Sequence, residues 1–102
     1  MALMCRAEDR SLYAAVDGEL DHHRAKEILM ELDRQIDMEL PRRLTLDLGG
    51  VSFMDSSGIA LLLGAHRRLG ELGGALRVVN VPAQSARVLR AAGIDHIISW
   101  EE

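Results

Sequence analysis

Apolar and polar residues group along the chain in blocks that predict strands and helices in turn. Two short apolar runs, residues 2–5 and 12–16, flank the charged residues 6–10, and polar residues between two such runs indicate a β-hairpin. Gly18 follows the second run and ends it. The chain is therefore predicted to begin with two antiparallel strands.

The next block has helical spacing. From residue 22 to about residue 38, apolar side chains recur three or four positions apart and charged ones fall mostly on the other side, which predicts an amphipathic helix. Asp21 precedes this helix and can cap it, because its carboxylate can accept a hydrogen bond from a first-turn amide. Pro41 ends the helix, since proline has no backbone N–H to donate.

A strand and a second helix follow. Residues 44–48 alternate strictly between apolar and polar, which predicts a strand with one buried face. Gly49 and Gly50 are interpreted as its end, and residues 51–55 as a loop. From Ser56 or Ser57 to about Leu72, leucine and isoleucine recur at helical spacing, which predicts a buried helix.

The residue pattern in the last third of the chain predicts a strand, a helix and a final strand. Residues 76–81 are rich in valine and read as a strand, which Pro82 closes. Proline also fits the first turn of a helix, here predicted over residues 83–92, and Gly93 fits its carboxyl end. The apolar run at residues 94–100 is predicted to be an edge strand.

This order of elements predicts the fold class. Strands joined through helices pair in parallel with right-handed crossovers, while the opening hairpin adds an antiparallel strand. The alternation in residues 44–48 differs from the continuous apolar run of a strand covered on both faces. We therefore expect an α/β fold with a mixed sheet of four to five strands and helices mainly on one face. Two cores would leave each half below the ~50 residues that a domain usually needs, so residues 1–102 are interpreted as one domain.

Composition narrows the class of partner. With 48% hydrophobic and 27% charged residues, the chain can bury a core and stay soluble. The net charge of -4 disfavours nucleic acids and anionic membranes as partners, because both select basic surfaces. Cys5 is the only cysteine, and no stretch approaches the ~20 apolar residues of a membrane span, so we expect a cytoplasmic protein. No sequence feature calls for a cofactor.

Two short segments carry the functional signal. Residues 51–58, VSFMDSSG, lie where a loop turns into the second helix, and residues 18–23, GELDHH, precede the first helix. Both resemble signature segments of the STAS family, in particular its bacterial anti-sigma-factor antagonists. The predicted order of strands and helices is similar to that fold over nearly the whole chain. The resemblance implies that Ser56, the first serine of Asp-Ser-Ser-Gly, is a phosphoacceptor.

The resemblance also implies a cycle of partner switching. The unmodified chain would bind an anti-sigma factor that is also a serine kinase and so release a sigma factor. The kinase would then phosphorylate Ser56, and a serine phosphatase would reset the chain, which is expected to be a monomer or a weak homodimer. The expected partner-binding residues are Asp21, His22, Asp55, Ser56, Ser57 and Gly58.

A phosphate at this position makes physical sense. A helix start offers free amides and the positive end of the helix dipole, so the domain tolerates the phosphate. A phosphoserine adds about -1.5 to -2 charges beside Asp55, and near Asp21 if the two loops are neighbours. A partner carboxylate or nucleotide phosphate at roughly 6 Å would repel each charge by ~3 kcal/mol before salt screening. Half of that for each of two charges already weakens binding about a hundredfold.

The sequence alone also allows purely structural roles for the same residues. Serine is a favoured N-cap, so Ser56 and Ser57 could simply cap the helix, or Ser57 could be the cap while Ser56 takes the phosphate. Asp21 could cap the first helix and still line the partner surface. Gly58 could let a partner approach Ser56 closely, or could serve packing inside the domain.

Enzymatic and metal-binding alternatives fit less well. A metal site of Cys5, Asp21, His22 and His23 is disfavoured because adjacent histidines on a helix point in different directions. A hydrolase is disfavoured because Ser56 lacks the Gly-x-Ser-x-Gly elbow. We expect no enzyme activity and no metal.

Two further alternatives concern the fold and its use. A response-regulator receiver could use Asp47 or Asp55 as phosphoacceptor, but it needs a lysine late in the chain, and the only lysine is Lys26 in the first helix. A STAS module could instead act in trans for a transporter, a lipid-transport complex or a stress-signalling assembly. Nucleotide binding is disfavoured because no glycine-rich phosphate loop joins a strand to a helix.

Overall fold

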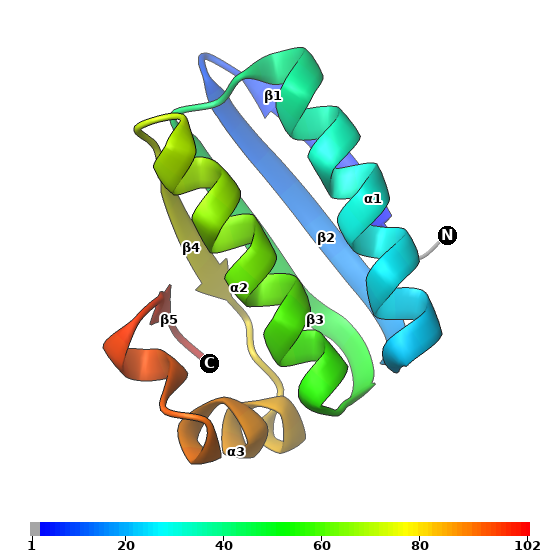
Figure 1. The fold of residues 1–102 in the computed structure, drawn as a ribbon. Coiled ribbons are helices and arrows are strands. Elements are labelled where there is room, and N and C mark those ends of the chain that lie inside the picture. The colour runs from blue at the N-terminus through cyan, green and yellow to red at the C-terminus, as the bar shows by residue number, and fades with distance from the viewer. Residues whose placement is uncertain (1–2) are drawn as a thin grey trace.

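The five strands form one sheet whose order follows the chain. The structure, a computed structural model, describes residues 3–102. Strand β1 runs antiparallel to β2, and the later strands are parallel to one another (Figure 1). The strands are β1 (Leu3–Glu8), β2 (Ser11–Leu20), β3 (Arg43–Met54), β4 (Ala75–Val79) and β5 (Ser99–Trp100). The helices are α1 (His22–Glu39), α2 (Ser56–Glu71) and α3 (Ala83–Ala91), with a short 3-10 helix, η1 (Ile94–His96). The predicted mixed sheet is confirmed.

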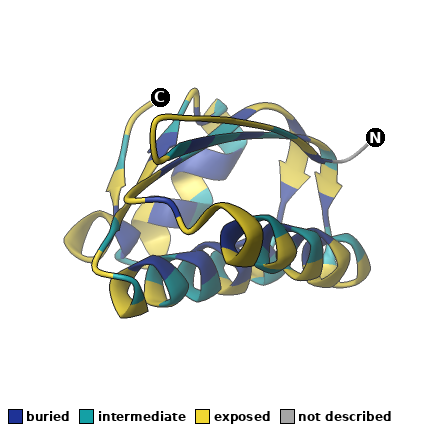
Figure 2. Cartoon of the chain, turned by 90° about the horizontal axis from the view of Figure 1, so that it is seen from above, coloured by how far each residue is buried: buried dark blue, intermediate teal, exposed yellow. Residues whose placement is uncertain are grey.

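One face of the sheet is buried under helices. Leu44, Leu46 and Val78 on that face have no exposed surface. On the opposite face, Thr45 is half-buried and Arg77 is exposed. Helices α1 and α2 lie side by side across the buried face (Figure 1). Figure 2 shows the buried residues gathered where the helices and the sheet face each other. The expectation of helices mainly on one face is confirmed.

Strand β3 is longer than predicted, and this matters for the site. The sequence pattern predicts that the strand ends at Gly49 and Gly50 and that residues 51–55 form a loop, but β3 continues to Met54. It does so because β2 also continues past Gly18, so that Leu20 is paired with Met54 across two register shifts. A Cβ on Gly50 would lie 2.8 Å from the Cβ of Asp17. Gly50 therefore permits a close approach of two strands and does not end one.

The opening hairpin is confirmed, but its connection is shorter than expected. Residues 6–8 belong to β1, and only Asp9 and Arg10 form the turn. Both have positive φ, 49° and 65°, as a two-residue hairpin turn of the primed type requires. The charged side chains before the turn lie on an edge strand, where charge discourages pairing with other chains. Met1 and Ala2, part of the predicted first run, lie outside the described residues.

The C-terminal region differs most from its prediction. Residues 94–100 form η1 and a strand of only two residues. Ile94 and Ile98 are both buried and are four positions apart, so the run follows helical rather than strand spacing. Helix α3 occupies nearly its predicted range, and Pro82 precedes it as the N-cap residue.

Candidate functional site

Ser56 is the first residue of α2 and is exposed. The residue before it, Asp55, caps the helix, because its carboxylate accepts a hydrogen bond from the Ser57 amide at 2.8 Å. The Asp55 carbonyl accepts a second one from the Gly58 amide at 3.0 Å. Neither serine is the cap, so the alternatives that gave Ser56 or Ser57 that role are wrong. The Ser56 hydroxyl is therefore presented to solvent at the amino end of a 16-residue helix.

The first turn of α2 packs on the end of β3. Met54 is 1% exposed and lies beneath Gly58, where an added Cβ would come within 2.5 Å of the Met54 Cγ. Gly58 itself is buried. Of the two roles that the sequence left open for Gly58, the structure supports the packing role directly.

A glutamine from α3 holds the main chain just before Ser56. The Met54 amide donates to the Gln84 Oε1 at 2.9 Å, and the Gln84 Nε2 donates to the Met54 carbonyl at 2.8 Å. The two residues are 30 positions apart, and nothing in the sequence around Gln84 signals this contact. Sequence reasoning therefore missed it.

Asp21 lies at the end of the neighbouring strand. Since Leu20 pairs with Met54, Asp21 and Asp55 each follow the last residue of two adjacent parallel strands. Asp21 caps α1 by accepting a hydrogen bond from the Arg24 amide at 2.9 Å. The capping role expected for Asp21 is confirmed, and the two signature segments of the sequence meet at one edge of the fold.

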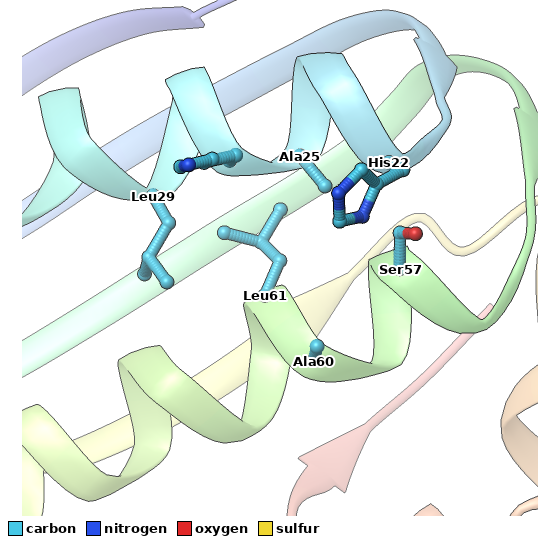
Figure 3. Close-up of a pocket in the computed structure, with 7 residues that line it drawn as sticks. His22, Ala25, Leu29, Ser57, Ala60 and Leu61 are labelled. Carbon is cyan, nitrogen blue, oxygen red and sulfur yellow. The ribbon is translucent and has the colours of Figure 1, made fainter.

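A shallow apolar groove between α1 and α2 adjoins this edge. It has a volume of about 210 Å³ and is lined mostly by Ala25, Leu29, Ala60 and Leu61, with His22, Lys26 and Ser57 completing it. In Figure 3 the His22 imidazole and the Ser57 side chain lie opposite each other between the first turns of the two helices. His22 is exposed, and Ser57, the residue after Ser56, is half-buried.

The residues of the metal-site alternative are not brought together. Cys5 pairs with Ala14 on the edge strand, whereas Asp21 and the histidines follow the far end of β2. His23 is 3.5 Å from the Glu27 carboxylate. Burial raises the pKa of the Cys5 thiol, which keeps it protonated at neutral pH. Within the described part of the chain, no three side chains of the metal-ligating types gather.

Asp47, a candidate of the receiver alternative, is engaged in the sheet. It accepts hydrogen bonds from the Tyr13 hydroxyl and from the Gly49 amide, the latter at 2.8 Å. Burial acts to raise the pKa of the Asp47 carboxyl, but these bonds and one from Asn80 outweigh it and lower that pKa. The bond to Asp47 also raises the pKa of Tyr13. The sheet order β1-β2-β3-β4-β5 differs from the 2-1-3-4-5 order of flavodoxin-like folds.

None of the helices found in residues 3–102 is long and apolar enough to cross a bilayer. The site is thus an exposed serine at a helix start, two acidic caps on adjacent strand ends and an apolar groove beside them. Such an arrangement can present a hydroxyl to another protein and has surface around it that can make contacts.

Comparison with curated proteins identifies relatives over most of the chain. An anti-sigma F factor antagonist of Paenibacillus polymyxa is 32% identical over 87 residues, which cover 85% of this chain and 74% of the relative. An anti-sigma F factor antagonist of Lysinibacillus sphaericus is 34% identical over 77 residues, covering 76% of this chain and 66% of the relative.

Solved structures agree with this. The anti-sigma factor antagonist SpoIIAA in its unphosphorylated form has a TM-score of 0.83 and 25% identity, covering 99% of this chain and 89% of SpoIIAA. The phosphorylated form of the Bacillus SpoIIAA has a TM-score of 0.74 and 25% identity, covering 99% and 92%. The family model described as the STAS domain matches residues 4–102. The chain therefore belongs to the STAS domain family, as a relative of its anti-sigma factor antagonists.

Proposed function

We propose that this chain is an anti-sigma-factor antagonist whose binding to its partner is switched by phosphorylation of Ser56. The observation that carries the proposal is the exposed Ser56 at the start of α2, next to a cap that leaves its hydroxyl free for reaction. Two relatives are anti-sigma F factor antagonists, and SpoIIAA exists in phosphorylated and unphosphorylated forms. These relatives favour the antagonist over a module that serves a transporter.

The cycle needs two further proteins. The unmodified chain binds an anti-sigma factor with serine kinase activity and displaces a sigma factor from it. The same kinase transfers a phosphoryl group to Ser56, which weakens the complex, and a serine phosphatase removes it. In this cycle the chain acts by binding and does no chemistry of its own.

The partner surface extends from Ser56 over the neighbouring strand ends and helix starts. Phe53 adds an apolar contact, since its side chain is 44% exposed only three positions before Ser56. Buried Gly58 contributes by letting the first turn of α2 pack on Met54. The residues proposed to make or shape this surface are Asp21, His22, Asp55, Ser56, Ser57 and Gly58.

The switch rests on charge rather than on unfolding. A phosphate on Ser56 lies at the amino end of α2, whose free amides and dipole stabilise an anion, and the first turn holds no acidic residue. The partner instead meets two new negative charges on Ser56. These follow Asp55 directly, at the end of the strand that is paired with the strand leading to Asp21. Repulsion of ~1.5 kcal/mol for each charge weakens the complex about a hundredfold.

Phosphosite mapping tests the proposal. The chain is incubated with ATP and the kinase-type anti-sigma factor encoded in the same genome, and the products are digested and analysed by mass spectrometry. We expect a single phosphate on Ser56, because Ser56 is an exposed residue while Ser57 is half-buried. A stable complex without phosphate on Ser56, or phosphate on Ser57 in its place, would contradict the switch.

Replacement of Asp21 by alanine is expected to weaken the complex more than it weakens the fold. Loss of the cap costs about 1 kcal/mol, or a decrease of about 4–8 °C in melting temperature for a domain of this size. Loss of the carboxylate from the partner surface is expected to raise the Kd at least about tenfold, a change of ~1.4 kcal/mol. Calorimetry of binding and thermal unfolding measure the two effects.

Asp21→Asn is the matched control, because asparagine caps helices as well as aspartate does. This variant should keep the melting temperature and still bind more weakly. If Asp21→Ala loses stability but retains its affinity, Asp21 is only a cap.

A further inference from the structure

We propose that Gln84 is a positioning residue for the phosphorylation of Ser56, an inference that rests on the proposed function. Its side-chain amide forms both hydrogen bonds with the main chain of Met54, one as acceptor at 2.9 Å and one as donor at 2.8 Å. Gln84 is the second residue of α3, a helix that otherwise takes no part in the site.

The two bonds take the place of a missing strand. Strand β4 pairs with β3 only from Arg43 to Asp47, so the later residues of β3 have no strand neighbour on that side. In a sheet, the N–H and C=O of one residue point to the same neighbouring strand. The amide of Gln84 supplies the donor and acceptor that such a neighbour would supply at Met54. Helix α3 thereby closes the end of β3, as its position in Figure 1 illustrates.

Met54 is consequently held from three directions. Its main chain is bound by Gln84, its strand position is paired with Leu20, and its side chain is buried beneath Gly58. Only Asp55 separates it from Ser56. A rotation of the Met54 peptide would therefore move both the carboxylate that caps α2 and the hydroxyl that receives the phosphate.

Phosphoryl transfer is sensitive to such a movement. The attacking oxygen must lie in line with the leaving group, and catalysis of this reaction consists largely of positioning. A misplacement of about 1 Å by a change away from the reacting atoms can cost about a hundredfold in rate. The affinity of the partner for the whole surface is less sensitive to this movement, because Gln84 is half-buried and its side chain binds the main chain of Met54. Gln84 is thus expected to affect the rate of transfer more than the affinity.

Two substitutions test this. Gln84→Met preserves the length of the side chain but removes both hydrogen bonds. Gln84→Glu retains an acceptor for the Met54 amide but turns a carboxylate toward the Met54 carbonyl. In single-turnover phosphorylation at saturating kinase, we expect each variant to slow phosphate transfer to Ser56 at least about tenfold, with the Kd for the kinase changed less than about threefold.

Two controls separate positioning from general loss of stability. Val88→Ala removes packing by a half-buried side chain of the same helix and leaves the two Gln84 hydrogen bonds in place, so it should lower the melting temperature and leave the rate unchanged. Gln35→Met makes the same substitution near the carboxyl end of α1, where the Gln35 side chain donates a hydrogen bond to Glu31. As a control, it should leave the rate of phosphate transfer unchanged.

The outcomes are distinguishable. Wild-type rates in Gln84→Met, with phosphate still found on Ser56, would overturn the inference and leave the proposed function intact. An equal slowing in Val88→Ala would also overturn it, because stability alone would then explain the effect. Absence of phosphate from Ser56 in the wild-type chain would overturn the proposed function and this inference together.

Discussion

Ser56→Ala is expected to accept no phosphate and to bind the anti-sigma partner as the unmodified chain does, whereas Ser56→Asp binds about tenfold more weakly. The alanine removes the hydroxyl that accepts the phosphoryl group but leaves the Asp55 cap and the Met54 contact in place. The aspartate adds about one negative charge at the start of α2, half of what a phosphate adds, and so gives about half of its free-energy effect. Full phosphorylation should weaken binding about a hundredfold.

Binding calorimetry and phosphate incorporation measure these effects, and two serines serve as controls. Ser57→Ala should still take up phosphate on Ser56, because the cap contact uses the Ser57 backbone and not its hydroxyl. Ser99→Asp adds the same charge on β5, an exposed position on another part of the sheet, and should leave the affinity unchanged. Phosphate at an undiminished level in Ser56→Ala would assign the acceptor to another residue.

Gly58→Val is expected to destabilise the fold by about 3 kcal/mol. The added Cβ would lie 2.5 Å from the Met54 Cγ, and Met54 is 1% exposed, so its side chain would have to shift within the core. Forcing extra atoms into a packed core costs about 1–3 kcal/mol, and valine adds a branched side chain. At about 4–8 °C per kcal/mol, the melting temperature should fall by more than 10 °C.

Gly70→Val provides the matched control in the same helix. Apart from its two chain neighbours and the backbone of its own helix, no atom of residues 3–102 lies within 4 Å of a Cβ built on Gly70, so the change should alter stability by no more than about 0.5 kcal/mol. Met54→Ala should relieve the conflict, and a double-mutant cycle with Gly58→Val should show a coupling energy above about 1 kcal/mol. A Gly58→Val protein as stable as the wild type would refute the packing role of this glycine.

The helices could be predicted nearly to the residue because local signals define them. Helix α1 begins after the Asp21 cap and ends before Pro41, and its apolar spacing is continuous between them. The strands were harder, because a glycine that ends a strand and a glycine that permits close approach look the same in a sequence. Gly50 is of the second kind, and its reason lies in Asp17 on another strand.

Some residues of the site could likewise be predicted from local motifs, whereas the contacts between them could not. Ser56 and Asp21 could be selected because each lies in a short contiguous motif at a predicted helix start. That the two motifs meet depends on the register of β2 and β3, including two register shifts that no local pattern reveals. The Gln84 contact depends on where α3 packs after the sheet has formed, and so it has no signature within a few residues of either partner.

The pairing of Leu20 with Met54 restricts how this protein can change in length during evolution. Each residue of a strand advances about 3.3 Å, and a slip of one residue turns every side chain to the other face. A deletion or insertion between Ala15 and Leu20 would therefore carry Asp21 away from Ser56 or expose the buried leucines, unless β3 changed by the same amount. Indels should instead accumulate at the opposite ends of these strands, around the Asp9 and Arg10 turn.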